Sequence, residues 1–286
     1  MKAGVPCCVD PHQKAEALEV IARRGRELGS LPVLAPGLQD LQWAGGLASP
    51  TLGLYGEVQS HNASLAVALT SHFLAATGGQ TQGEDRARAV LTGLERTEWP
   101  GRSQTITRDS VQFYLDGAHT EESMASCHQW FSHQATQTDS SRVSRVLIFN
   151  TTGDREVRCL LSPLASLQLD LVIFCTNISR QASSASVDQQ NFNTNYQIQL
   201  ARCETHSEAW RDLSTDVPCL TVPCYDEAVL AVTATRLKDL QADLQADLRP
   251  SLPLSIPASV SQAETLQILV TGSLHLVGAV LGLLQR

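Results

Sequence analysis

The chain has 286 residues, a hydrophobic content of 43% and a formal net charge of −8 at pH 7. This length and composition suffice for one large hydrophobic core or two smaller ones. The 21 Lys and Arg residues are dispersed along an acidic chain, which argues against binding to nucleic acid or to an acidic membrane surface through a basic patch. The eight cysteines form no CxxC pair, so we expect reduced thiols, several of them buried, in an intracellular protein.

The first third of the chain predicts a helix over 11–28, which follows the N-cap pair Asp10-Pro11, and then a short strand over 31–34. A further strand is predicted over 52–56, before a helix that begins near Glu57. That helix can place four apolar residues toward a core: Ala63, Ala66, Val67 and Phe73. Residues 76–85 are rich in Gly, Gln and Thr, which indicates a flexible segment.

From residue 97 onward, apolar runs of strand length alternate with helical patterns, which predicts a Rossmann-like α/β domain whose mostly parallel sheet has helices on both faces. Strands are expected over 103–107, 111–115, 143–150, 169–175, 220–223 and 267–270, and helices over 120–131, 155–164, 192–213 and 226–248. The apolar stretch over 266–284 is almost long enough to cross a bilayer. Because Thr271-Gly272-Ser273 and His275 interrupt it, we expect a strand, a turn and a last helix, without stable membrane insertion.

The richest stretch chemically is the turn between the strand over 111–115 and the following helix. Asp116 stands at the carboxyl end of the strand, His119 follows three residues later, and Thr120 fits an N-cap. Ligands bind at the carboxyl ends of strands in open α/β sheets, so this acid and imidazole are candidate functional groups. The alternative is that they only cap the helix and satisfy the amides of the loop. Arg102 follows a Pro-Gly turn and could meet phosphate, or form an ordinary surface ion pair. We expect neither Arg102 nor Asp116 to fill a core.

Five sequence blocks occur in the same order in the folylpolyglutamate synthases of the Mur ligase superfamily, and the sequence resembles the eukaryotic type of this enzyme. The blocks are GEVQSHNA from Gly56, WPGR from Trp99, DGAH from Asp116, FNTTGDR from Phe149 and VTGSLHLVG from Val270. The resemblance implies three parts: residues 1–75 as the tail of a P-loop ATPase domain, 76–96 as a flexible linker, and 97–286 as the carboxyl-terminal Rossmann-like ligase domain. The phosphate loop itself, GxxxxGK[ST], does not occur in the sequence.

The resemblance implies an ATP-dependent ligase that adds L-glutamate to the γ-carboxylate of tetrahydrofolate polyglutamates through an acyl phosphate. In that scheme Asn62 contacts adenine and Arg102 contacts phosphate. Asp116 holds the ribose or a metal-bound water, while His119 and Ser273 face the glutamate. The cofactors are ATP and Mg²⁺. We assign no metal ligand in this chain, because the resemblance places the Mg²⁺ ligands mostly in the amino-terminal domain.

The resemblance further implies a monomer located in the cytoplasm and in mitochondria, with tetrahydrofolate polyglutamates and L-glutamate as its partners. Without a phosphate loop, we expect the chain alone to be inactive. A competing hypothesis is a non-catalytic binding or regulatory module. An unrelated NAD enzyme is disfavoured because no GxGxxG motif follows a strand.

Overall fold

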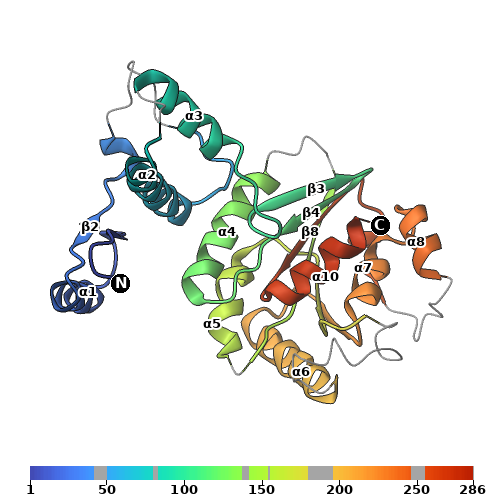
Figure 1. Cartoon of the computed structure of the whole chain (residues 1–286). Helices are drawn as coiled ribbons and strands as arrows, with labels where there is room; N and C mark the ends of the chain where they lie inside the picture. Colours follow the sequence, from blue (N-terminus) through green and yellow to red (C-terminus); the bar gives the residue numbers. More distant parts are fainter. Residues whose placement is uncertain are drawn as a thin grey trace. The chain divides into compact units, whose positions relative to one another are not determined.

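A computed structural model of the protein describes residues 1–41, 50–79, 83–136, 142–153, 155–179, 196–245 and 255–285. The chain divides into two compact units, Met1–Glu98 and Trp99–Arg286. Figure 1 shows the elements of both units.

The first unit contains a two-stranded parallel sheet and three helices. Strand β1 (Cys7–Val9) pairs with β2 (Pro32–Leu34), and α1 (Ala15–Leu28) connects them. The 3₁₀ turn η1 (Leu38–Asp40), α2 (Glu57–Thr77) and α3 (Gly83–Glu95) follow.

Several expectations for this unit were wrong. Helix α1 begins at Ala15 and not at Pro11, because Asp10 accepts a hydrogen bond from the amide of His12 in a local turn. Residues 52–56 form no strand, and part of the expected linker is the helix α3. Phe73 is 65% exposed and Ala66 is also exposed, because the apolar residues of α2 are spread around the helix instead of lying on one face.

The second unit is built on a six-stranded sheet in the order β3-β4-β8-β5-β6-β7. Its five strands from β4 to β7 are parallel, and the edge strand β3 is antiparallel to β4. The strands are β3 (Gln104–Arg108), β4 (Val111–Leu115), β5 (Val143–Phe149), β6 (Leu171–Cys175), β7 (Cys219–Val222) and β8 (Thr265–Thr271). The helices are α4 (Glu121–Ala135), α5 (Val157–Leu161), α6 (Tyr196–Leu213), α7 (Tyr225–Thr233), α8 (Lys238–Gln245), α9 (Ala258–Ser261) and α10 (Leu274–Leu284), with the 3₁₀ turn η3 (Pro163–Ser166). The predicted mostly parallel α/β sheet is therefore confirmed.

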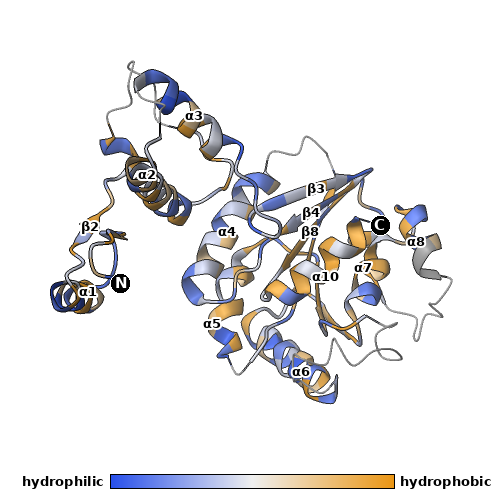
Figure 2. Ribbon diagram, in the orientation of Figure 1, coloured by the Kyte–Doolittle hydropathy of each residue, from blue (hydrophilic) through white to orange (hydrophobic). Residues whose placement is uncertain are grey.

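Alternate residues of the central strands point to opposite faces of the sheet, and both faces are covered. Phe113, Ile148 and Ile268 pack with side chains of α7, α8, α9 and α10 in one core. Tyr114 and Leu269 belong to a second core, with α4, α5, η3 and α6. Figure 2 shows α10 as predominantly hydrophobic, which agrees with its position against the sheet. Central strands buried on both faces explain why their sequences are apolar runs without alternation.

The last third of the second unit differs from its sequence-based prediction in one helix and agrees with it in the final strand and helix. The helix predicted over 226–248 is instead two helices, α7 and α8. The apolar stretch near the end of the chain forms β8, a turn and α10, as predicted. In the described part of the chain, no helix combines the length and hydrophobicity that a membrane span needs.

Candidate functional site at the strand ends

The candidate site of the second unit lies at the carboxyl edge of the neighbouring strands β4, β8 and β5. Leu115 pairs with Val270, and Val270 pairs with Ile148, so the segments after these three strands emerge side by side. Helix α4, after β4, packs on one face of the sheet, whereas α10, after β8, packs on the other. In open α/β proteins, ligands bind in the crevice at the carboxyl ends of two neighbouring strands whose following helices cover opposite faces of the sheet.

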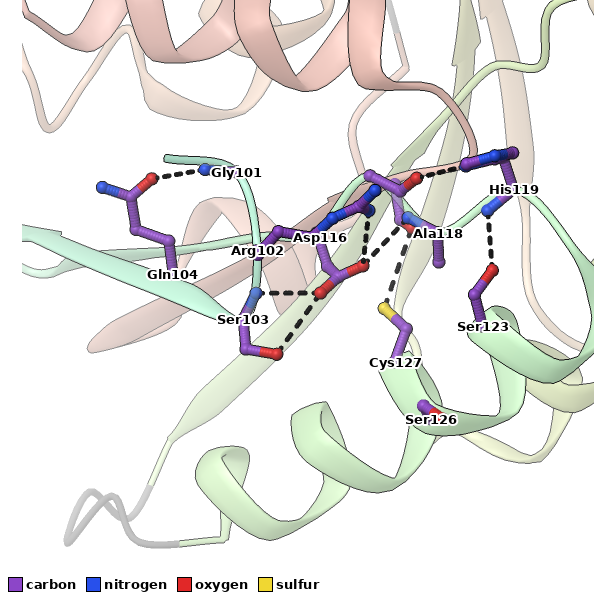
Figure 3. Close-up of polar contacts among 12 residues, drawn as sticks. Gly101, Arg102, Ser103, Gln104, Asp116, Ala118, His119, Ser123, Ser126 and Cys127 are labelled. Atoms are coloured by element: carbon purple, nitrogen blue, oxygen red, sulfur yellow. Dashed lines mark hydrogen bonds and ion pairs between the residues drawn. The ribbon is translucent and has the colours of Figure 1, made fainter. Parts of the chain in front are cut away.

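Asp116 is the buried acid of this edge, with only 8% of its surface exposed. Its Oδ2 accepts hydrogen bonds from the Ser103 amide at 2.8 Å and hydroxyl at 3.3 Å, and its Oδ1 accepts one from the Ala118 amide at 2.9 Å. Figure 3 shows the carboxyl group between these partners. Burial raises the pKa of Asp116 above its ordinary value, although the Ser103 amide, Arg102 and the Ala118 amide act to lower it. The carboxylate is thus incompletely compensated and can accept further hydrogen bonds.

Arg102 comes to the same place because β3 is antiparallel to β4. Gln104, at the start of β3, pairs with Leu115, at the end of β4. The Arg102 Nη1 lies 3.9 Å from Asp116 Oδ1, and the Arg102 side chain remains 30% exposed. Glycine at 117 leaves room for two side chains, since a Cβ there would lie 2.3 Å from Leu274 Cδ2 and 3.1 Å from Arg102 Nη1. The predicted Arg102 and Asp116 are therefore neighbours, and the guanidinium is accessible at the edge of the sheet.

His119 lies in the turn that leads into α4, where the backbone fixes its ring. Its Nδ1 is 2.8 Å from the carbonyl oxygen of Gly117. A carbonyl oxygen can only accept a hydrogen bond, so Nδ1 carries the proton and Nε2 of the neutral ring is an acceptor. Arg155 Nη1 donates to the His119 carbonyl oxygen at 2.7 Å. Thr120 caps α4 in a reciprocal arrangement with Ser123, so capping belongs to Thr120 and not to His119.

Ser273 occupies the corresponding turn after β8. It is buried, and its Oγ accepts a hydrogen bond from the His275 amide at 3.2 Å, which makes it the N-cap of α10. Helices α4 and α10 therefore both begin at this edge of the sheet. The positive ends of these two helix dipoles favour an anionic group such as a carboxylate or a phosphate.

Sequence reasoning assigned no role to three residues that complete this edge. Ser103 donates two hydrogen bonds to Asp116 from a backbone with φ of 42°. Arg155 holds the His119 turn, as described above. Asn150 follows β5 and is fully buried, and its Oδ1 has no hydrogen-bond partner among the described residues. Arg155 and Asn150 lie in the FNTTGDR block, which could have signalled them, whereas Ser103 has no sequence signal.

Asn62, the remaining predicted site residue, belongs to the first unit. It is exposed on α2, and its Nδ2 donates to Gln59 Oε1 at 3.1 Å. The role of Asn62 in adenine binding therefore stays a prediction.

The sequence is similar over nearly its whole length to folylpolyglutamate synthases. It is 34% identical to the mitochondrial enzyme of Bos taurus and 31% identical to that of Homo sapiens, and each alignment covers 99% of this chain but 57% of the relative. The chain thus spans little more than half the length of these curated relatives. No family model matches the sequence.

Solved structures show the same fold at lower sequence identity. Folylpolyglutamate synthase of Mycobacterium tuberculosis complexed with ADP superposes with a TM-score of 0.62 and 21% identity, covering 98% of this chain and 55% of that one. E. coli FolC in complex with DHPP and ADP gives a TM-score of 0.56 with 16% identity, covering 99% of this chain and 54% of that one.

The mostly parallel sheet with helices on both faces is the fold of the solved folylpolyglutamate synthases, a Mur ligase-type α/β fold. The curated relatives show that the chain belongs to the folylpolyglutamate synthase family and corresponds to the carboxyl-terminal portion of its members.

Proposed function

We propose that this chain supplies the carboxyl-terminal part of an ATP-dependent ligase that joins L-glutamate to the γ-carboxylate of tetrahydrofolate polyglutamates. The observation that carries the proposal is the grouping of Arg102, Asp116, His119 and Ser273 at one edge of the sheet, beside two helix N-termini. Solved relatives are described with ADP, and one with Mn, AMPPNP and L-glutamate, which is the ligand set that the reaction needs.

The chemistry requires a poor electrophile, the γ-carboxylate, to acquire a phosphate leaving group, after which the glutamate amine attacks the acyl carbon. Arg102 is suited to donate hydrogen bonds to phosphate oxygens, because its guanidinium stays charged and accessible. The Asp116 carboxylate, held by Ser103 and Ala118, orients Arg102 and can accept a hydrogen bond from a ribose hydroxyl or a metal-bound water.

His119 is suited to the glutamate end of the reaction. Its Nε2 can accept a proton from the glutamate ammonium group, and an amine must lose that proton before it can attack. The Ser273 turn and the N-terminus of α10 would meet a glutamate carboxylate. Mg²⁺ would neutralise phosphate charge, and we propose that its ligands come mostly from an amino-terminal ATPase domain.

We further propose that the chain acts as a monomer and that cytoplasmic and mitochondrial forms exist, since the mammalian relatives are named as mitochondrial enzymes. Because no phosphate loop occurs in its sequence, we expect the chain alone not to add glutamate.

The proposal is tested by measuring glutamate addition to tetrahydrofolate with ATP and Mg²⁺, for the chain alone and for the chain joined to the amino-terminal part of the Bos taurus relative. We expect product only from the joined protein. Arg102→Ala should reduce its turnover about 10- to 100-fold, the cost of a lost hydrogen bond to a charged group. His119→Ala should raise the KM for glutamate more than the KM for ATP.

The matched control is Arg211→Ala, which removes an exposed arginine from α6 and should leave turnover unchanged. Melting curves of each variant separate lost chemistry from lost folding. A correctly folded joined protein that binds nucleotide but makes no product would favour the non-catalytic binding module instead. Near-normal turnover of Arg102→Ala would contradict the assignment of Arg102 to phosphate.

A further inference from the structure

Three potential metal ligands meet in the first unit, far along the sequence from the strand-end site. Asp10 follows the last residue of β1, His12 lies two residues later, and His61 is in the second turn of α2. Helix α2 packs against β1, so the two segments are neighbours in the fold.

The Asp10 carboxylate is oriented by its own loop. Its Oδ1 accepts a hydrogen bond from the His12 amide at 3.0 Å, while the Asp10 carbonyl oxygen accepts one from the Gln13 amide at 3.4 Å. Pro11 restricts the backbone between the acid and the first histidine. The carboxylate is therefore held in place before any ligand arrives.

Both histidines present a ring nitrogen to this carboxylate. His12 Nδ1 is 2.9 Å from Asp10 Oδ1, and His61 Nδ1 is 3.8 Å from Asp10 Oδ2. The two rings are stacked in parallel, with centroids 4.0 Å apart and planes inclined by 3°. One nitrogen from each histidine and one carboxylate oxygen all lie within 4.8 Å of one another.

The three side chains offer complementary groups to one cation. Each imidazole has a ring nitrogen that can donate a lone pair to a metal ion, and the Asp10 carboxylate has two oxygen acceptors. These donor atoms come together at one place in the fold.

We propose that Asp10, His12 and His61 form a binding site for a divalent transition-metal ion, with Zn²⁺ as the best match. Two imidazole nitrogens and one carboxylate suit zinc and its neighbours, whereas Mg²⁺ and Ca²⁺ prefer oxygen ligands alone. Ligand atoms around tetrahedral zinc lie about 3.4 Å apart, given bonds of about 2.1 Å. One ring nitrogen from each histidine and one Asp10 oxygen lie within 4.8 Å of one another, so side-chain rotation alone can bring the three atoms to that spacing.

The exposure of the three side chains fits an ion with one coordination position open to solvent. Asp10 is 13% exposed, His61 27% and His12 57%. A water molecule can therefore complete the tetrahedron. The site uses two residues from the loop after β1 and one from α2, so bound zinc would cross-link the first unit and stabilise it.

The test is isothermal titration of the whole chain with Zn²⁺ after chelator treatment, together with Co²⁺ absorbance as a probe of coordination. We expect one Zn²⁺ per chain, and visible Co²⁺ bands of tetrahedral intensity without thiolate charge transfer. His12→Ala should weaken Zn²⁺ binding at least tenfold. It is the preferred variant because His12 is exposed in a loop, so its loss should not disturb folding.

The matched control is His72→Ala, which removes another histidine of α2 that is outside the cluster and should bind Zn²⁺ like the unchanged chain. A second variant, Cys7→Ser with Cys8→Ser, removes the nearby thiols and should also keep binding. Equal affinities of His12→Ala and His72→Ala, loss of binding in the double serine variant, or no zinc binding by the unchanged chain would each overturn the proposal.

Discussion

The Asp116 carboxyl group illustrates how one residue can serve both the fold and the candidate site. The sequence placed it on a turn, and we expected it not to fill a core. It is in fact buried and accepts hydrogen bonds from two backbone amides, of which Ala118 is fully buried. The local expectation was wrong because the Ser103 loop, 13 residues away, covers the carboxyl group.

Replacing Asp116 with Ala should therefore lower the free energy of unfolding by about 1–3 kcal/mol, since an unpaired buried amide is costly. Urea denaturation at pH 7 measures this change. Asp212→Ala is the control, because Asp212 forms an exposed ion pair with Arg158 at 3.2 Å and its loss should cost at most about 0.5 kcal/mol. Equal costs for the two variants would contradict the structural role of Asp116.

His206 is a buried imidazole whose titration should be visible in the stability of the protein. It is 1% exposed on α6, its Nε2 lies 3.0 Å from the Thr151 hydroxyl, and it packs against Phe149 and Phe174. Burial, together with the charge of Arg202, lowers the pKa of His206 to about 3. The unfolded chain, with an ordinary histidine pKa of about 6.5, therefore binds this proton first as the pH falls.

This difference in pKa predicts that the stability contributed by neutral His206 is complete above about pH 6.5 and is lost as the pH falls toward 3. Between pH 7 and 5 the loss should be about 2 kcal/mol, at a limiting slope of about 1.4 kcal/mol per pH unit. Urea denaturation of the unchanged chain and of His206→Gln measures it, because glutamine removes the titration. A slope unaffected by His206→Gln would show that His206 is not a source of acid sensitivity.

At the scale of the elements, the turn between β8 and α10 needs a glycine, because β8 lies beside β5 and the segment after β5 passes close to the turn. Gly272 has φ of 97°, and a Cβ there would lie 2.3 Å from the Asn150 carbonyl oxygen. Both the backbone conformation and the close approach of the β5 segment exclude a side chain.

Gly272→Ala should therefore destabilise the protein by about 1–3 kcal/mol or more, the cost of a strained backbone. Gly278→Ala is the matched control in the same region, because Gly278 is exposed within α10 and a Cβ there meets no atom within 4 Å. It should stabilise the helix by up to about 1 kcal/mol. Denaturant midpoints of the two variants should move in opposite directions, and a shared direction would contradict this account of the turn.

The sequence predicted the central strands of the second unit well, because strands buried on both faces are continuous apolar runs. The strand expected over 267–270 is β8, Thr265–Thr271, and that over 143–150 is β5, Val143–Phe149. The sequence-based prediction was less accurate where tertiary contacts determine the local structure. The helix expected over 226–248 breaks before α8, where Arg236 donates hydrogen bonds to Ser110 and to carbonyl groups at Val260 and Ala263.

Only part of the candidate site could be predicted from the sequence. Asp116, His119 and Ser273 follow strands, and neighbouring parallel strands place their carboxyl ends at one edge. Their proximity therefore follows from topology. The reach of Arg102 to Asp116 depends on β3 being antiparallel, and the hydrogen bonds of Ser103 depend on a positive φ, neither of which the sequence pattern indicates.

At the scale of the whole molecule, the two units differ in how much hydrophobic surface each removes from water. Among the described residues of the first unit, the buried hydrophobic side chains are few and mostly small: Val9, Ala35, Leu38, Ala63 and Ala87. Most of the large exposed hydrophobic side chains belong to this same unit, including Leu31, Leu34, Leu69 and Phe73. The second unit instead has a complete core on each face of its sheet.

This asymmetry predicts that residues 99–286 fold by themselves, whereas residues 1–98 do not form a cooperative unit alone. Each buried large apolar side chain contributes about 1.5–3 kcal/mol, and ordering each residue costs about 1–2 kcal/mol of backbone entropy, so a unit with few such side chains cannot be stable. The measurement is circular dichroism and urea denaturation of the two segments and of the whole chain. We expect residues 99–286 to unfold in one sigmoidal transition at nearly the urea midpoint of the whole chain, and residues 1–98 to show a gradual loss of signal. A sharp transition for residues 1–98 would mean that apolar contacts outside the five buried residues stabilise the first unit. A molten second segment would mean that its core requires the first unit, contrary to the division of the chain at Trp99.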